Sequence, residues 1–447
     1  MAEVRERLSD DELYRAAVDV LNVNRTSRGT KASPHLYPHQ WSWDAAFIAM
    51  GLAVFDPNRA RDEMDFLFAG QWSNGMIPHI VFNPDAHGYF PGPERWECHK
   101  VSTHAPAGVA TSGIMQPPVH ALALQAIMDA DTCIGNDIVH EWHRNALDHV
   151  VAWHRYLHNE RIDPATGLIT LFHGWESGMD NSHRWDDSYR NVVPQFDLPP
   201  YTRRDTGHVG SIAERPDSID YDRYIWLLEE GKRVGYEALA WKQAGSFRVG
   251  DVFATALFSA ASDSAAECAE DLHCSDVAHE MRDMADAARV AVTEHCDMAS
   301  GCAYDVDLRS GKPLCTQTIA GFAPLLCLQA GTKKFDAARR TLFSSEWCGR
   351  ESLALPLPPS TSPSAPVFEA ERYWRGPVWP IMNWVLGWGL ARAGDITGAI
   401  HLRKHGLDEL REGSFAEYYD PFSGKPLGSH GQSWTAAAAL LWLSAFS

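Results

Sequence analysis

The chain of 447 residues lacks the signature motifs of several common enzyme classes. It contains no H-E-x-x-H, no Walker A sequence, no G-x-G-x-x-G after a strand and no G-x-S-x-G elbow. These four patterns belong to zinc binding, phosphate binding, dinucleotide binding and a nucleophilic serine, respectively. Their absence disfavours each of these chemistries, and we expect neither a metal nor a cofactor.

Positive charge and long apolar runs are also scarce. Lys and Arg number 39 against 58 Asp and Glu, a net charge of -19 that disfavours nucleic acids and anionic membranes as partners. The longest apolar stretch, 435–446, is too short to span a bilayer, and residues 1–7 lack the apolar core of a signal peptide. We expect a cytoplasmic protein with no membrane partner; its oligomeric state stays open, a homo-oligomer included.

Disulfides are not expected either. The nine cysteines form no C-x-x-C pair, and an odd number without such pairs is typical of reduced, mostly buried thiols.

Helical periodicity is what the sequence has in abundance. Apolar residues recur at helical spacing in segments that begin near Ser9, Ser42, Pro57, Gln116, Asn136, Asp222, Gly250, Ser275, Thr316, Lys334, Pro377, Asp395 and Gly431. Strand-like pieces are confined to connections, at 77–82, 168–172 and 303–308. About a dozen helices without a parallel-strand pattern predict a single all-α domain over 1–447, an (α/α)6 barrel or toroid of paired helices. An irregular α-solenoid is the alternative, although its repeats should be more alike.

A short turn signature, D-x-x-[S/T]-G, occurs at 163–167, 297–301 and 420–424. Asp and Ser/Thr side chains accept hydrogen bonds from nearby backbone amides, and Gly adopts positive φ without strain. Each occurrence therefore predicts a tight turn.

Three long irregular segments interrupt the helices, at 71–115, 174–221 and 346–376. Long ordered loops inside one domain are commonly functional. These contain Trp, Arg, His and Asp rather than the composition of disordered chain. We expect them to form the wall of a pocket, or a cap over it.

Tryptophan is abundant, with 17 residues. Nine fall in or beside polar loops: Trp41, Trp43, Trp72, Trp96, Trp175, Trp185, Trp374, Trp379 and Trp434. Such rings suit the apolar faces of sugars, but they also bring buried area wherever they pack. Composition alone favours neither interpretation.

The densest cluster of chemical groups lies at 173–187. It holds four carboxyl groups, Glu176, Asp180, Asp186 and Asp187, among glycines and tryptophans. A carboxyl group against aromatic surface is partly desolvated, which raises its pKa and suits it to general acid catalysis. A turn with solvated carboxylates explains the cluster about equally well.

Other candidate groups stand near the ends of the chain. Glu417 lies between aromatic residues, ahead of the turn-forming Asp420, although a lone surface glutamate would have the same pattern. Asp44 falls in a first helical turn, where a carboxylate is electrostatically favourable without any further role. The segment 372–383 combines arginines with aromatics, and Gln432 stands at a helix start.

Taken together, these segments resemble glycoside hydrolase family 63, whose trehalase relatives share the (α/α)6 barrel. The matching pieces run in order along the chain: Gln40-Trp-Ser-Trp-Asp44 followed by Ala45-Ala-Phe47, Gly75-Met-Ile-Pro78, Glu176-Ser-Gly-Met-Asp-Asn-Ser182, Tyr373-Trp-Arg-Gly-Pro-Val-Trp379 with Asn383, and Glu417-Tyr-Tyr-Asp-Pro421. Within the family, the chain is most similar to compact bacterial members that act on glucosylglycerate, some of which accept mannosylglycerate. Larger members carry a β-rich domain or a membrane anchor, which we do not expect here.

The resemblance implies an inverting hydrolysis of an α-linked sugar, with Asp180 as general acid and Glu417 as general base. An inverting enzyme leaves room for a water molecule between its two carboxyl groups. The substrate would be a small sugar with a carboxylate aglycone.

A glycerate carboxylate needs a cationic partner, for which bidentate arginine is well suited. Arg203, Arg204 and Arg215 follow Asp180, and we favour Arg215, although a loop arginine is most often simply solvated. The other expected substrate contacts are Tyr37, Trp41, Trp43, Asp44, Gln116, Tyr221, Tyr373, Trp374, Trp379 and Gln432.

Three alternatives remain at this point. The chain could be a trehalase-like or general α-glucosidase of the same fold, or a sugar-binding toroid without activity. A sugar epimerase on a similar toroid would rely on histidines, whereas the best clusters here are carboxylates.

Overall fold

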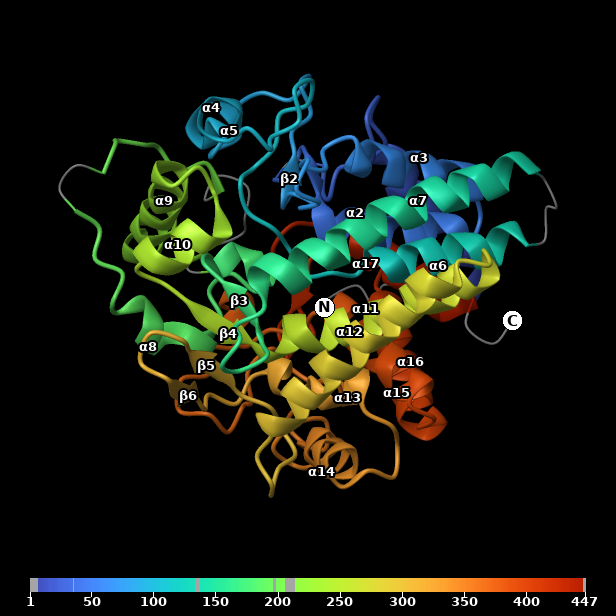
Figure 1. Cartoon of the computed structure of the whole chain (residues 1–447). Coiled ribbons are helices and arrows are strands. Elements are labelled where there is room, and N and C mark those ends of the chain that lie inside the picture. Colours follow the sequence, from blue (N-terminus) through green and yellow to red (C-terminus); the bar gives the residue numbers. More distant parts are fainter. Residues whose placement is uncertain (1–6, 35, 133–136, 196–197, 206–213, 445–447) are drawn as a thin grey trace.

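The computed structural model of the chain (Figure 1) describes residues 7–34, 36–132, 137–195, 198–205 and 214–444. Three predicted features lie wholly or partly outside the described residues. They are the first six residues of the segment compared with a signal peptide, the expected helix start at Asn136 and parts of the 174–221 segment. Within them, no helix is long and apolar enough to cross a membrane.

Six helices pack against one another in a series of contacts that returns to its first member. In contact order they are α2 (Ser42–Ala53), α6 (His120–Asp131), α11 (Val252–Asp271), α13 (Pro324–Cys327), α15 (Pro380–Arg392) and α17 (Ser433–Ser444), which packs on α2. These helices are buried nearly all round, and every residue of α2 is buried. Apolar residues on all sides of a helix indicate a position inside a core.

Each of these six has a second helix on its outer side. The pairs are α17 with α1 (Asp10–Val23), α2 with α3 (Pro57–Phe68), α6 with α7 (Asp137–Tyr156), α11 with α12 (Ser275–Glu294), α13 with α14 (Lys333–Leu342), and α15 with α16 (Ile396–Leu410). The outer helices are amphipathic: α1 buries Leu13, Ala17 and Leu21, which are spaced at one turn, and exposes its charged residues. Ser9 and Glu12 form a capping box at its start.

Most helices begin within three residues of the positions predicted from periodicity. The exceptions are the helices expected at Gln116, Asp222 and Thr316, which begin at His120, Ser218 and Pro324. The last of these is preceded by a short 3-10 turn over Ile319–Phe322 and lies entirely in the core. Helix periodicity therefore located the elements, but not every boundary.

The structure also contains short strands. The strands do lie in connections between helices, but four of them form an antiparallel sheet in the order β3 (Ile169–Leu171), β4 (Val249–Asp251), β5 (Asp305–Asp307) and β6 (Lys312–Leu314). Two short ladders join β1 (Gln40–Trp41) to β2 (Ile80–Val81) and β7 (Tyr418–Tyr419) to β8 (Pro426–Leu427). A strand as short as β4 leaves little signal in the sequence.

The predicted D-x-x-[S/T]-G turns are confirmed. In each turn the Asp Oδ1 accepts hydrogen bonds from two backbone amides, as Asp420 does from Phe422 at 2.9 Å and Ser423 at 2.7 Å. The final glycine has positive φ, 69° at Gly424. A fourth turn of the same sequence and geometry, 307–311, connects β5 to β6.

The three long segments contain short elements. The first, 71–115, holds β2, α4 (Pro93–Trp96) and α5 (Cys98–Val101), and the third holds a 3-10 turn, η7 (Tyr373–Arg375). The second holds η2 (Gly174–Ser177), η3 (His183–Trp185) and α8 (Asp186–Tyr189), and it ends in the first turn of α9 (Ser218–Arg233), which α10 (Ala238–Ala244) follows. In Figure 1, α8, α9 and α10 lie with the sheet on one side of the paired helices.

Candidate active site

A pocket of about 1080 Å³, including the space at its mouth, gathers nearly all of the substrate-contact and catalytic residues predicted from the sequence. Its lining includes Tyr37, Trp41, Trp43, Asp44, Gln116, Asp180, Arg215, Tyr221, Tyr373, Trp374, Glu417 and Gln432. They come from positions spread between the approach to α2 and the approach to α17, including the second and third long segments. A pocket of this size with a few converging polar groups is typical of a small-molecule site.

Trp379 is the exception, because it does not line the pocket. Its ring stacks on that of Trp374, with centroids 3.7 Å apart and planes at 6°. Its Nε1 donates a hydrogen bond of 3.2 Å to the carbonyl of Tyr373. Trp379 therefore packs against two neighbouring pocket residues, and its direct contact with sugar stays a prediction.

Glu417 is held firmly at the start of the β7–β8 ladder. Its Oε1 accepts a hydrogen bond of 3.0 Å from the Tyr37 hydroxyl, and its Oε2 accepts from the backbone amide of Ser429 at 3.1 Å and from its hydroxyl at 3.2 Å. The side chain is buried, and this burial raises its pKa, while Arg215 and these hydrogen bonds oppose the rise. Three donors on one carboxylate favour its ionised form.

Asp180 has a different environment. Burial raises its pKa to about 7, with Arg215 lowering it and Glu417 raising it further. Its backbone carbonyl accepts a hydrogen bond of 3.3 Å from Tyr224. Near neutral pH a carboxyl group with this pKa is protonated in a large share of molecules, as a general acid requires.

Gly178 allows the Asp180 loop to pack closely against Trp43, which lines the pocket. It follows η2 with a φ of 70°, and a Cβ there would lie 2.3 Å from the Trp43 ring. Only glycine accommodates both the left-handed backbone and this contact. Gly178 thus allows the loop that carries Asp180 to pack directly against the Trp43 ring.

Asp44 is a third carboxyl group in the pocket. It lies in the first turn of α2, yet burial raises its pKa to about 8, with Glu417 and Asp180 contributing. The sequence had suggested a carboxylate stabilised by the helix N-terminus, but desolvation outweighs that effect here. Asp44 therefore holds a proton at neutral pH and is able to donate a hydrogen bond.

Arg215 brings a positive charge to the two carboxyl groups. Its Nη1 donates a hydrogen bond of 3.0 Å to Tyr37, and its guanidinium carbon lies 4.2 Å from the ring centroid of Tyr373. Of the other two arginines considered, Arg203 pairs with Asp205 at 2.7 Å, while Arg204 is exposed and lines the pocket. Arg215 is the buried one, and its own distance to Asp205 is longer, 3.5 Å.

Two amide side chains are anchored by their oxygen atoms. Oε1 of Gln116 accepts from the backbone amide of Trp43 at 3.2 Å, and Oε1 of Gln432, 3.1 Å from the Ser429 hydroxyl, shares the single proton of that hydroxyl with Glu417. Fixed amides of this kind present their NH₂ groups in a defined direction, which suits the recognition of sugar hydroxyls.

Sequence reasoning missed several lining residues. They are His79, His87, Tyr89, Phe90, Asp205 and Tyr224. Trp175 and Trp434 also line the pocket, and they were counted among the loop tryptophans but not predicted as substrate contacts. Of the nine loop tryptophans, Trp41, Trp43, Trp175, Trp374 and Trp434 line the pocket, and the others pack elsewhere. The density of aromatics in 71–115 and 174–221 was the available signal, but it did not say which rings face the cavity.

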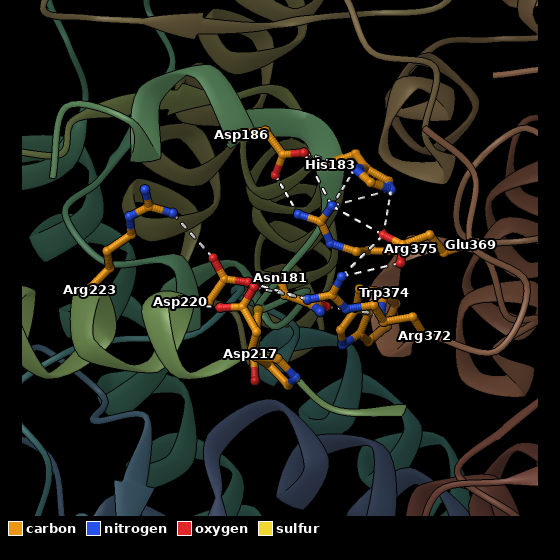
Figure 2. Close-up of polar contacts among 12 residues, drawn as sticks. Asn181, His183, Asp186, Asp217, Asp220, Arg223, Glu369, Arg372, Trp374 and Arg375 are labelled. Carbon is orange, nitrogen blue, oxygen red and sulfur yellow. Dashed lines mark hydrogen bonds and ion pairs between the residues drawn. The ribbon is translucent and has the colours of Figure 1, made fainter. Parts of the chain in front are cut away.

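The other carboxyl groups of the 173–187 cluster form ion pairs outside the pocket. Glu176 is fully buried and pairs with Arg161 at 2.6 Å, while Asp186 pairs with Arg375 at 2.6 Å (Figure 2). Asp187 is exposed and pairs with Arg190. Only Asp180 of the four lines the pocket. Among the residues that the structure describes, no group of three or more His, Cys, Asp or Glu is arranged to hold a metal ion.

The family model for the mannosylglycerate hydrolase MGH1-like glycoside hydrolase domain matches residues 37–435. The chain belongs to this family. The glycoside hydrolase is 45% identical to the glucosylglycerate hydrolase of Mycolicibacterium hassiacum, over 97% of the chain and 98% of that protein. It is 38% identical to the mannosylglycerate hydrolase of Thermus thermophilus, over 95% of the chain and 99% of that protein.

Solved structures agree with this assignment. The fold of the glycoside hydrolase matches the GH63 mannosylglycerate hydrolase from Thermus thermophilus in complex with Tris and D-glycerate, with a TM-score of 0.86 at 38% identity over 96% of the chain and 99% of that chain. The complex of the same enzyme with glucose gives a TM-score of 0.84 at 36% identity, over 96% of this chain and 99% of that one. The neutral trehalase Nth1 from Saccharomyces cerevisiae shares the fold at 14% identity and a TM-score of 0.58, covering 93% of this chain and 73% of that one.

Proposed function

We propose that this glycoside hydrolase cleaves the α-glycosidic bond of glucosylglycerate with inversion, releasing glucose and glycerate, and that it also accepts mannosylglycerate. One observation carries the proposal: a single pocket contains Asp180, Glu417 and Arg215, with the two carboxyl groups in unlike environments. Unlike environments for paired carboxyl groups are how one site supplies both an acid and a base.

In this mechanism Asp180 donates its proton to the glycosidic oxygen as the bond to the sugar breaks. Glu417 accepts a proton from a water molecule, which attacks the anomeric carbon from the opposite face. Inverting enzymes separate the two carboxyl groups by about 6.5–9.5 Å so that this water fits. The fixed hydrogen bonds of Glu417 support its role as base, because they keep the carboxylate ionised and oriented.

The substrate assignment rests on charge and on the relatives. A glycerate carboxylate would bind Arg215, with Tyr37 and Tyr221 beside it, because a buried guanidinium is a strong partner for a carboxylate. The relative with the higher identity is named for glucosylglycerate, and the Thermus thermophilus relative for mannosylglycerate. The sugar would lie between Trp43, Trp374 and the amides of Gln116 and Gln432.

We further propose that residues 1–447 form one (α/α)6 barrel with the pocket at one end. The closed series of helix contacts and the outer partner of each helix support the barrel. The segments 71–115, 174–221 and 346–376 would form its cap, since each contributes pocket residues: Tyr89 from the first, Asp180 from the second and Trp374 from the third.

A substrate panel tests the function. Purified enzyme is incubated with glucosylglycerate, mannosylglycerate, trehalose and maltose, and proton NMR follows the first anomer that forms. We expect β-glucose first and fastest from glucosylglycerate. Equal or faster cleavage of trehalose or maltose would favour the general α-glucosidase, and α-glucose as the first product would overturn inversion.

The catalytic assignments are tested by Asp180→Asn and Glu417→Gln. Each should lower kcat by about 10²–10⁴-fold, the usual contribution of a positioned acid or base. Hydrolysis that survives in both variants would overturn these roles, and a wild-type protein that binds sugar but cleaves none would favour the non-catalytic toroid.

A further inference from the structure

A network of charged and polar side chains outside the pocket lining joins three separate segments of the chain (Figure 2). We call it the charged network. Its members are His183 and Asp186, which follow Asp180; Glu369, Arg372 and Arg375 in the third long segment; and Asp217 and Asp220 at the start of α9. Arg223 extends it along α9 through Asp220.

Arg375 is the centre of this network. Its Nη2 lies 2.6 Å from Oδ1 of Asp186 and its Nη1 lies 3.2 Å from Oδ2, a two-pronged contact. The same Nη1 is 2.6 Å from Nδ1 of His183 and 3.5 Å from Oε1 of Glu369. Two-pronged arginine–carboxylate pairs fix direction as well as distance.

Arg372 links the third segment to α9. It contacts Oε2 of Glu369 at 3.2 Å, and it lies 3.6 Å from Asp217 and 3.7 Å from Asp220. Asp217 also caps α9, accepting a hydrogen bond of 2.8 Å from the backbone amide of Asp220. The beginning of α9 is therefore tied to the third segment.

Every segment in the network carries pocket residues, although none of its charged members lines the pocket. Asp180 precedes His183 by three positions, Tyr373 and Trp374 lie between Arg372 and Arg375, and Tyr221 follows Asp220. The network can therefore influence substrate only through these neighbours.

A direct link runs from the network to the Asp180 loop. The backbone amide of Trp374 donates a hydrogen bond of 3.1 Å to Oδ1 of the buried Asn181. Tyr373 next to it has a φ of 36°, a left-handed conformation that an aromatic residue seldom adopts. Such a conformation persists only where the surroundings hold it, and Arg372 and Arg375 anchor the backbone on either side.

We propose that Arg375 and Asp186 are positioning residues, which hold the loop of Asp180 against Trp374 in the geometry that hydrolysis needs. The inference deepens the proposed function and rests on it. In this view the ion pair acts on catalysis, not on substrate affinity, because the acid must be aimed at the glycosidic oxygen while the sugar is bound mainly by other residues.

Kinetics of Arg375→Ala, Asp186→Asn and the double variant test the proposal. Each single variant should lower kcat about 10²-fold, the effect expected of a displacement near 1 Å, with KM changed less than about threefold. The double variant should lose no more than the worse single variant, since both remove the same contact. Arg375→Lys keeps the charge without the two-pronged geometry and should retain more activity than Arg375→Ala.

Arg289→Ala is the matched control. Arg289 joins α12 to α11 through an ion pair of 2.6 Å with Asp263. The exposed fractions of these two side chains, 27% and 20%, are similar to those of Arg375 and Asp186, 11% and 32%. No residue of α11 or α12 lines the pocket. Arg289→Ala should lower the melting temperature comparably and leave kcat unchanged.

Hydrogen exchange gives a readout that does not depend on activity. Exchange in the peptide covering 369–376 should be about tenfold faster in Arg375→Ala and Asp186→Asn, and unchanged in Arg289→Ala. The proposal is overturned if kcat stays within twofold in both single variants, if their losses simply add in the double variant, or if exchange at 369–376 does not change. A wild-type protein that hydrolyses none of the glycosides would overturn the proposed function instead, and hydrogen exchange would still decide whether the network holds the loop.

Discussion

The hydroxyl group of Tyr37 donates a hydrogen bond of 3.0 Å to Oε1 of Glu417. The oxygen of this hydroxyl accepts a hydrogen bond of 3.0 Å from Arg215, and it lies 3.2 Å from the Tyr373 hydroxyl. Tyr37 thus connects the proposed base to the proposed carboxylate-binding arginine. A tyrosine in this position stabilises the ionised form of Glu417, because it donates to the charge.

The first prediction concerns this hydrogen bond. Tyr37→Phe removes the donor, so the pKa of Glu417 should rise and the acidic limb of the kcat/KM profile should move to higher pH. We expect kcat/KM at its optimum to fall by about 10–100-fold, the cost of one hydrogen bond to a charged group. Tyr373→Phe is the comparison, since its hydroxyl contacts Tyr37 but not Glu417. An acidic limb that stays in place in Tyr37→Phe would contradict the role of this contact.

The second prediction is the pH profile of the wild-type enzyme. Burial raises the pKa of Asp180 to about 7, so the acid loses its proton and kcat/KM declines as the pH rises through about 7. On the acidic side, activity is lost as Glu417 gains a proton. This loss should occur at a pH above the ordinary carboxyl range, because burial raises the pKa of Glu417 too. A bell-shaped profile with its alkaline limb near pH 7 is expected, with both limbs belonging to the interacting pair. A rate that is flat from pH 6 to 9 would exclude Asp180 as the acid.

The third prediction separates charge recognition from catalysis. Arg215→Met removes the buried positive charge while keeping similar bulk. KM for glucosylglycerate should rise about 10–100-fold, whereas KM for glucosylglycerol, which has no carboxylate, should change little. Arg215 also lowers the pKa of Asp180, so the alkaline limb should move to higher pH in the variant. An equal rise in KM for both compounds would show that Arg215 does not bind the carboxylate.

The helices and turns were predictable because their causes are local. Apolar periodicity located the outer helix α1. The D-x-x-[S/T]-G signature forms a turn where it recurs, through an Asp side chain such as that of Asp420 and a glycine with positive φ such as Gly424. The fourth such turn, at 307–311, follows the same rule, although its match in the sequence was not among those identified.

The site was predictable only in part, because its contacts join distant residues. Asp180 could be singled out from its own surroundings, whereas the base role of Glu417 came from the family resemblance. His79 and Asp205 reach the pocket through packing that no local pattern records. Trp374 and Trp379 have the same sequence character, and no local pattern shows that Trp374 lines the pocket while Trp379 stacks on its ring.

The fourth prediction concerns stability. Asp44 has its pKa raised to about 8 by burial, so between about pH 4 and 8 the folded state holds a proton that the unfolded state has released. Stability therefore falls as the pH rises through this window. Asp44→Asn removes the titrating group. The change in melting temperature that this variant causes should be more positive at pH 8 than at pH 4.5, by a few degrees. An equal or smaller gain at pH 8 would mean that the pKa of Asp44 is not raised in the folded state.

The last prediction concerns the contact between Gly178, in the Asp180 loop, and the ring of Trp43. Gly178→Ala places a Cβ 2.3 Å from the ring of Trp43 on a backbone with a φ of 70°. The loop must then shift away from Trp43, so we expect kcat to fall by about 10²-fold or more and the protein to be destabilised. Gly331→Ala has a similar backbone, with a φ of 88°, but no atom within 4 Å of the added Cβ. Gly331→Ala should cost only the backbone strain, about 1–2 kcal/mol in urea-induced unfolding, and leave kcat at the wild-type value. If the two variants behave alike, the contact between Gly178 and Trp43 does not position Asp180.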